Sequence, residues 1–179
     1  MQCKRALEEA GGDIEKARII LRKKGSEIAS KKSDRELNAG AVSAYVHNTH
    51  QVSALVQLSC ETDFVSKNDE FIALARDIAM HVTALAPRYI ARDAIPSEVI
   101  EKVKEVFQSE INNEMQDKPA ELREKILAGK LDTYFKEQTL LEQQFIKDPD
   151  CTIAGLIETA TQKFGERIIV SAMSRLSVK

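Results

Sequence analysis

Histidine and cysteine side chains are the residues of this chain that could bind a metal or act as nucleophiles. His47 and His50 have the HxxH spacing, which on a helix presents two metal ligands, but here the pair spans a predicted hairpin turn. At a turn this spacing does not bring the two rings together, so we expect both side chains in solvent. Cys3, Cys60 and Cys151 lie far apart, which predicts reduced thiols rather than a zinc site or a disulfide framework.

Motifs for nucleotide binding and covalent catalysis are absent from the sequence. The seven glycines are scattered, and neither GxxxxGK[ST] nor GxGxxG can be written anywhere in the chain. No serine stands in the context of a hydrolase nucleophile. His81 lies between apolar neighbours of a helical pattern, and we expect it partly buried or at the rim of the core. We therefore expect no metal or other cofactor, and no covalent chemistry.

The stretch CETDFVSKNDEF, residues 60–71, is the one local sequence that departs from the patterns around it. It places Phe64 among charged neighbours, after a strand pattern and before a helix pattern. The ring either turns inward and joins Phe71 in the core or is offered to a partner, because large aromatic side chains are common binding anchors. The residues alone leave both alternatives open.

Alternating apolar and polar residues predict the strands that flank this stretch. The alternation extends over residues 42–46 and, after a short polar break, over residues 52–60, which is typical of an antiparallel hairpin with one buried face. Val42 and Val46 belong to that predicted buried face. The same alternation over residues 168–178 predicts the third strand that a stable sheet needs.

Helical periodicity predicts a helix directly after the CETDFVSKNDEF stretch and another before the last strand. The first has Asn68 as a predicted N-cap and ends before Pro87. The second has Thr152 as a predicted N-cap and Gly165 as a predicted C-terminal residue.

The middle of the chain contains two further helical patterns. One begins at Ser97, after Pro96, and Val106 lies on its predicted inner face. The other begins near Pro119, because proline suits the first turn of a helix. Its predicted apolar residues are Leu122, Ile126, Tyr134, Leu141 and Phe145.

These patterns predict an α+β fold in which an antiparallel three-stranded sheet is covered by helices. We place this core domain at residues 39–179. Residues 1–24 are predicted to form a small helical segment, whose second helix Asp13 can cap, and residues 25–38 a basic linker. Two short helices cannot enclose a core, so this segment is expected to dock on the main body or to lack a further helix.

The charge is distributed unevenly along the chain. The net charge is -2, yet residues 1–35 contain ten Lys and Arg against six Asp and Glu. An overall negative charge is atypical of a protein whose main role is to bind nucleic acid. The basic segment of residues 22–35 still leaves an alternative, an RNA-associated protein that uses this segment as an RNA-contacting patch, although it has no aromatic residues for base stacking.

Composition and hydropathy bear on where the protein is found. Hydrophobic residues make up 43% and charged residues 30% of the 179 residues, as in a folded domain. No stretch approaches the roughly 20 apolar residues of a membrane span, and the N-terminus lacks the pattern of a secretory signal. We expect a soluble protein of the bacterial cytoplasm or of an organelle matrix or stroma.

Several motifs of this chain resemble those of the elongation factor Ts family. The sequence TDFV, residues 62–65, stands between a strand and a helix as the hallmark of that family does. Residues 3–10 and 12–17 resemble the second and third helices of its ubiquitin-associated-type domain. Residues 140–146 and 165–169 resemble its C-terminal signatures. The resemblance covers essentially the whole chain.

The resemblance implies the short form of the family, which has a single core and is a homodimer. The first helix of the N-terminal domain has no counterpart here, so we expect that domain to be truncated. The sequence AMSR, residues 172–175, stands where some short members have a dimer-linking cysteine. The implied homodimer is therefore non-covalent, and its interface is expected around Met173.

The resemblance also implies a function for the TDFV sequence. Members of the family bind elongation factor Tu, GDP-bound or nucleotide-free, and act as guanine nucleotide exchange factors without covalent chemistry. Phe64 would be a wedge inserted into the partner's nucleotide-binding domain, and Asp63 its companion near the magnesium and phosphates. Thr62 and Val65 would shape the loop and contact the partner, and Met1 would add a further contact.

Overall fold

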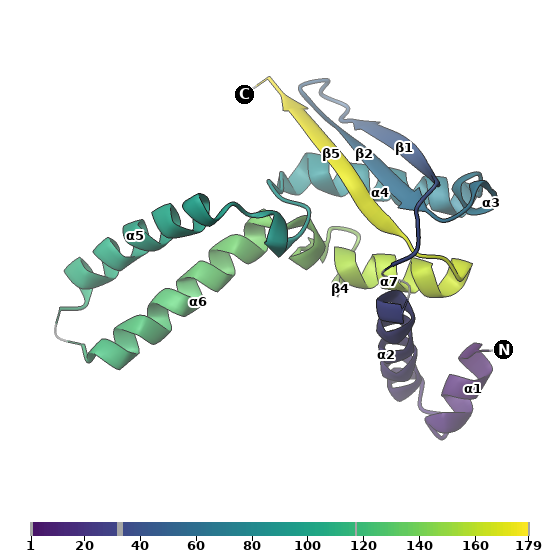
Figure 1. Cartoon of the computed structure of the whole chain (residues 1–179), viewed down its shortest axis with the longest axis horizontal. Helices are drawn as coiled ribbons and strands as arrows, with labels where there is room; N and C mark the ends of the chain where they lie inside the picture. The colour runs from purple at the N-terminus through teal and green to yellow at the C-terminus, as the bar shows by residue number, and fades with distance from the viewer. Residues whose placement is uncertain (1, 32–33, 117, 179) are drawn as a thin grey trace. The chain divides into compact units, whose positions relative to one another are not determined.

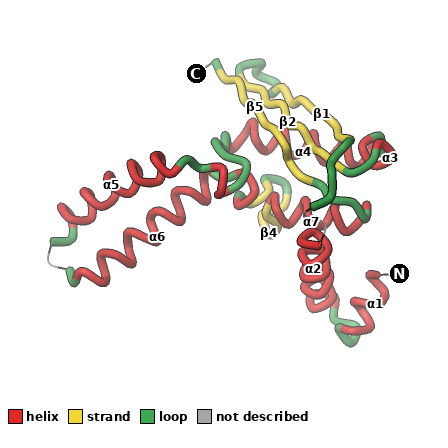
Figure 2. Tube along the Cα trace, viewed as in Figure 1, coloured by secondary structure: helices red, strands yellow, loops and turns green. Residues whose placement is uncertain are grey.

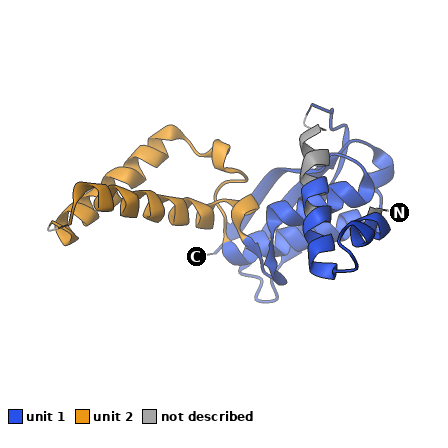
Figure 3. Cartoon of the chain, turned by 90° about the horizontal axis from the view of Figure 1, so that it is seen from below, with its two compact units in different colours: residues 1–85, 144–179 blue, residues 86–143 orange. Residues whose placement is uncertain are grey.

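The computed structural model describes residues 2–31, 34–116 and 118–178. The chain divides into two compact units, of which unit 1 spans residues 1–85 and 144–179 and unit 2 spans residues 86–143 (Figure 3). Met1, a predicted partner contact, lies outside the described residues. The other predicted site residues all belong to unit 1.

Unit 1 is built on an antiparallel sheet that has three strands within the described residues (Figure 1). The hairpin of β1 (Ala39–Val46) and β2 (Val52–Cys60) was predicted, and so was the third strand, β5 (Ile169–Ser177). Both predictions are confirmed, and the strand order is β1-β2-β5. The central strand β2 therefore connects directly into the stretch that contains Phe64.

Helix α4 (Asp69–Leu85) covers one face of this sheet (Figure 2). Its predicted N-cap is confirmed, because Asn68 Oδ1 accepts a hydrogen bond from the backbone N–H of Glu70. The helix and the sheet enclose the core of unit 1, in which Phe71, Ile78 and Leu58 are fully buried.

The face of β1 that is turned towards α4 is the opposite of the one predicted. Ser43 lies opposite Val56 of β2 and its hydroxyl donates to the carbonyl of Ile72 in α4, so this side chain faces inward. Val42 and Val46 lie on the other face and are 67% and 56% exposed, so their predicted burial is wrong. The period of the alternation is right, but small side chains such as Ala41 and Ser43 on the inner face let the helix approach the strand closely.

A β-bulge in β5 changes which of its residues face the core. Val170 and Ala172 lie opposite adjacent residues of β2, which leaves Ser171 as the extra residue. Val170 is buried, whereas Ala172 and Leu176 lie on the exposed face. The bulge therefore adds apolar residues of β5 to the face that already contains Val42.

Helix α7 (Ile153–Phe164) completes the core of unit 1. Both predicted caps are confirmed, since Thr152 Oγ1 accepts from the N–H of Gly155 and Gly165 has a φ of 73°. The ring of Phe164 packs edge-on against Phe71, with 6.1 Å between the ring centroids. A short hairpin of β3 (Gln144–Phe145) and β4 (Asp148–Thr152) leads into the helix.

The N-terminal segment is a helical hairpin, as predicted. It consists of α1 (Gln2–Glu9) and α2 (Ile14–Lys31), and Asp13 Oδ1 accepts from the backbone N–H groups at positions 15 and 16. Helix α2 packs against α7. It continues past residue 24, so the first residues of the predicted linker are helical.

Unit 2 consists mainly of two long helices, α5 (Ser97–Glu114) and α6 (Ala120–Gln138), with short 3₁₀ helices η1 (Arg92–Ala94) and η2 (Leu140–Glu142). The predicted starts at Ser97 and near Pro119 are confirmed. The predicted extension of the second helix to Leu141 and Phe145 is wrong. Thr139 has an extended backbone and pairs with Tyr89, a contact between distant segments that ends the helix at Gln138.

The inner face of α5 also differs from the prediction. Val106 is half exposed, whereas Ile111 is fully buried. The neighbouring Phe107 packs edge-on against Tyr134 of α6, with ring centroids 5.7 Å apart. The helix is therefore turned so that its aromatic residue rather than Val106 lies towards α6.

Candidate functional site

The segment between β2 and α4 contains a single helical turn, α3 (Asp63–Ser66). We call this turn and the preceding Thr62 the Phe64 loop. Phe64 is 83% exposed, whereas Val65 is 4% exposed. The alternative in which Phe64 joins Phe71 in the core is therefore wrong. Val65 occupies the inward position. Phe64 directly precedes it, and adjacent residues of a helical turn point in different directions.

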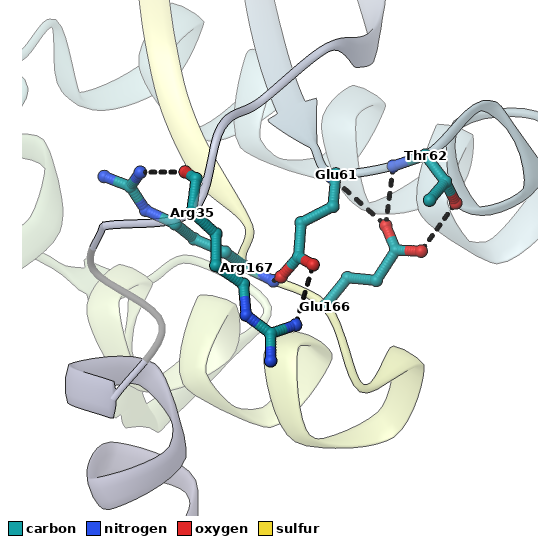
Figure 4. Close-up of polar contacts among 5 residues, drawn as sticks. All are labelled: Arg35, Glu61, Thr62, Glu166 and Arg167. Atoms are coloured by element: carbon teal, nitrogen blue, oxygen red, sulfur yellow. Dashed lines mark hydrogen bonds and ion pairs between the residues drawn. The ribbon is translucent and has the colours of Figure 1, made fainter.

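The base of the Phe64 loop is held by one carboxylate from the far end of the chain (Figure 4). Glu166 Oε2 accepts from the backbone N–H groups of Glu61, at 3.1 Å, and Thr62, at 3.0 Å. Glu166 Oε1 accepts from the Thr62 hydroxyl at 2.6 Å. Hydrogen bonds to an ionised carboxylate are shorter and stronger than neutral ones, so Thr62 has a defined position.

A second carboxylate makes the reverse contact (Figure 4). Glu61 Oε1 accepts from the backbone N–H of Arg167 at 2.6 Å, and its Oε2 pairs with Arg35 Nη1 at 2.8 Å. The guanidinium of Arg167 donates to the carbonyl of Arg35 at 2.6 Å. We call Arg35, Glu61, Glu166 and Arg167 the carboxylate clasp. It joins the end of β2 to the start of β5.

Asp63 presents its carboxylate to solvent beside Phe64. Lys67 Nζ, four residues further on, lies 2.6 Å from Asp63 Oδ2. The hydrogen bond and charge of Lys67 lower the pKa of Asp63 below its ordinary value of 3.8. The carboxylate is therefore ionised at neutral pH, and an ion pair this exposed is easily exchanged for another cation.

Cys60 and the three histidines differ in their burial and hydrogen bonds. Burial raises the pKa of the Cys60 thiol, which donates to the carbonyl of Thr62 at 3.2 Å and is not a thiolate at neutral pH. His81 is fully buried, and its Nδ1 accepts from the backbone N–H of Ile146 at 3.4 Å. His50 is exposed in the β1–β2 turn, where His47 is partly covered.

The described residues also bear on metal sites and membrane spans. They contain no group of three or more His, Cys, Asp or Glu residues arranged to hold a metal ion. None of the helices in this part of the chain is long and apolar enough to cross a membrane.

The structure places the four residues of the predicted site in different surroundings. Asp63 and Phe64 lie at the surface, Thr62 is bound to Glu166, and Val65 is in the core. The contact of Glu166 with Thr62 was not predicted. The signature at residues 165–169 marks Glu166 but does not show what it contacts, because 104 residues separate it from Thr62.

Comparison with known proteins gives the family of this chain. The family model described as Elongation factor TS matches residues 15–178. Over 178 residues, 99% of this chain, the sequence is 48% identical to elongation factor Ts of Carboxydothermus hydrogenoformans and covers 81% of that protein. It is 47% identical to elongation factor Ts of Thermodesulfovibrio yellowstonii over the same length, with 87% of that protein covered. The chain therefore belongs to the elongation factor Ts family of translation elongation factors.

Proposed function

We propose that this chain binds elongation factor Tu and promotes release of GDP by inserting the Phe64 loop near the magnesium and phosphate site of the partner. The observation that carries the proposal is the exposed ring of Phe64 on a loop whose base is held by the carboxylate clasp. An exposed aromatic ring buries a large apolar area when it enters a pocket of a partner. Because the loop is ordered beforehand, little conformational entropy is lost on binding.

Asp63 supplies the electrostatic part of the proposed mechanism. Its ionised carboxylate would lie next to the inserted ring, where it competes with the phosphates for the magnesium ion. Lys67 would have to release Asp63 or move with it, and the high exposure of this ion pair makes its separation inexpensive. The exchange involves no covalent step, because it changes only the non-covalent contacts of the nucleotide.

The proposed binding is reversible by either nucleotide. If this chain weakens the affinity of the partner for GDP, GDP must weaken the affinity of the partner for this chain by the same factor. The chain would therefore bind GDP-bound elongation factor Tu transiently and the nucleotide-free form tightly. An acceleration of about a thousandfold corresponds to roughly 4 kcal/mol of barrier lowering.

Release of a fluorescent GDP analogue from purified elongation factor Tu tests the proposal. We expect the intact chain to accelerate release and Phe64→Ala to lose most of the acceleration, by about a hundredfold for an interface anchor of about 3 kcal/mol. Asp63→Ala is expected to lose a smaller part.

The matching stability control uses urea unfolding. Phe64→Ala should change the free energy of unfolding by less than about 0.5 kcal/mol, because the ring is exposed. Phe71→Ala in the core should cost about 3–5 kcal/mol. No acceleration by the intact chain, or full activity of Phe64→Ala, would refute the proposed function.

We also propose that the chain forms a non-covalent homodimer through the face of the sheet that α4 does not cover. Exposed Val42, Val46, Leu55 and Leu176 lie on this face. Monomeric proteins rarely leave a contiguous apolar patch of this kind in water. Met173, the predicted centre of the interface, lies opposite Val56 on the inner face, so the residues next to it in β5 are the better candidates.

The alternative function, an RNA-associated accessory protein, depends on residues 22–35. Most side chains of this segment lie outside the described residues. That alternative remains a prediction from charge alone.

A further inference from the structure

We propose that Glu166 is a positioning residue that holds the Phe64 loop in the conformation that meets the partner. The inference rests on the proposed function and assigns a further residue to it. Glu166 lies directly after Gly165, which ends α7, and shortly before β5 begins. Its backbone is therefore part of the rigid framework of unit 1, while its carboxylate reaches the loop.

The first support is the unusual use of Thr62. This residue occupies the N-cap position of α3, where a threonine side chain ordinarily accepts a hydrogen bond from the helix backbone. Here it makes no such bond, and its hydroxyl donates to Glu166 Oε1. The orientation of the turn is thus determined by a distant carboxylate rather than by its own cap.

The second support is the crossed arrangement of the carboxylate clasp. Glu166 accepts from the backbone at Glu61 and Thr62, while Glu61 accepts from the backbone N–H of Arg167. Each segment thus supplies a carboxylate to the backbone of the other, and a shift of either one strains both sets of hydrogen bonds. Arg35 neutralises part of the negative charge that the two glutamates bring together.

The third support is how the clasp and the core together define the direction of Phe64. The turn is held on one side by Thr62 and on the other by the buried side chain of Val65. With residues on both sides of Phe64 held, its ring has little freedom other than its own rotamers. Without Glu166, the turn keeps the buried side chain of Val65 and the bond from the Cys60 thiol to the Thr62 carbonyl, but the two backbone N–H groups are free to bind water in other loop conformations.

A less ordered Phe64 loop should change one kinetic parameter of exchange and not the other. If the binding-competent conformation becomes a minor one, the concentration needed for half-maximal exchange rises by the inverse of its population, while the rate at saturation stays the same. For Glu166→Ala we expect this concentration to rise about tenfold, because the substitution removes three hydrogen bonds to a carboxylate at the base of the loop. If Glu166 instead contacted the released nucleotide directly, Glu166→Ala would lower the rate at saturation.

The experiment compares three variants in the GDP-release assay as a function of their concentration. Glu166→Gln should retain most of the activity, because the amide oxygen can still accept from both N–H groups and the Thr62 hydroxyl can rotate to accept from the amide nitrogen. Asp77→Ala is the matched control, since it removes a carboxylate outside the loop. The Oδ1 atom of Asp77 lies 2.7 Å from Lys147 Nζ. This control variant should behave as the unaltered chain does.

A double-mutant cycle separates positioning from general stability. If Glu166 acts through Phe64, Glu166→Ala should have little further effect in a chain that already has Phe64→Ala. An equally large loss in both backgrounds would overturn the inference, and so would full activity of Glu166→Ala in the otherwise unaltered chain.

Amide hydrogen exchange of the free chain tests the inference independently of elongation factor Tu. Glu166→Ala should speed exchange at residues 61–66 by about tenfold and leave α4 unchanged, because local opening has its own free energy. Unchanged exchange at these amides would overturn the inference. If the intact chain fails to accelerate GDP release but the amides respond as expected, it is the proposed function that fails.

Discussion

At the scale of single residues, side chains close together in the Phe64 loop make different contributions. Val65 contributes to the core, Thr62 receives the carboxylate clasp, and Phe64 contributes to neither. A ring that is 83% exposed adds little to the stability of the free chain. The proposed wedge would give it a role in binding instead.

Asp63 is the residue whose titration reports on the loop. We expect Lys67→Ala to raise the pKa of Asp63 towards its ordinary value of 3.8, because Lys67 is the main cause of the lowered pKa. With Lys67 present, the folded-state pKa lies below the unfolded one. The contribution of the pair to stability is therefore present above pH 4 and is lost as the pH falls through the folded-state pKa.

Carboxyl carbon chemical shifts measured by NMR between pH 2 and 6 check this expectation. Lys147→Ala, which removes the separate ion pair with Asp77, should leave the titration of Asp63 unchanged. An Asp63 pKa that does not move in Lys67→Ala would contradict the role given to this ion pair.

At the scale of elements, a glycine in a closely packed strand and a glycine on an open helix surface differ in whether a larger side chain would fit. In β1, a Cβ added at Gly40 would lie 2.6 Å from the carbonyl oxygen of Leu58, so the strands would have to separate. In α6, a Cβ added at Gly129 would meet nothing within 4 Å. The same substitution therefore has opposite expected signs at the two positions.

We expect Gly40→Ala to lower the free energy of unfolding by about 1–3 kcal/mol, the usual cost of overpacking. Gly129→Ala should raise it by about 0.5–1 kcal/mol, because alanine loses less conformational entropy in a helix interior. Urea unfolding followed by circular dichroism measures both. Equal effects of the two substitutions would show that strand packing at Gly40 is looser than described.

At the scale of the whole molecule, the uncovered face of the sheet is the feature that a single copy does not explain. We expect Val42→Glu to convert the proposed dimer into a monomer, because the two introduced charges, one from each protomer, cannot be buried without partners in an apolar interface of this kind. Val106→Glu in α5, a matched change of another exposed valine, should leave the assembly unchanged.

Sedimentation velocity over a range of protein concentrations checks the assembly. The unaltered chain should sediment as a dimer and Val42→Glu as a monomer with unchanged circular dichroism. A monomeric unaltered chain at all concentrations would exclude the proposed homodimer, and a dimer that survives Val42→Glu would place the interface elsewhere.

The features that could be predicted from the sequence are local ones. Alternation over residues 52–60 and caps such as Asn68 and Thr152 depend on neighbours within a few positions, so they were predicted correctly. The TDFV sequence was recognisable because its four residues are contiguous. From this sequence alone, the family and the position of the candidate site could be predicted.

Features that depend on contacts between distant segments could not be predicted from sequence patterns. The approach of α4 to Ser43 determined which face of β1 is buried, the pairing of Tyr89 with Thr139 ended α6, and the bulge at Ser171 changed the exposed face of β5. The outward direction of Phe64 and its support by Glu166 are of the same kind. Burial and long-range hydrogen bonds are properties of the packed chain, and periodicity reports only the spacing of residues along it.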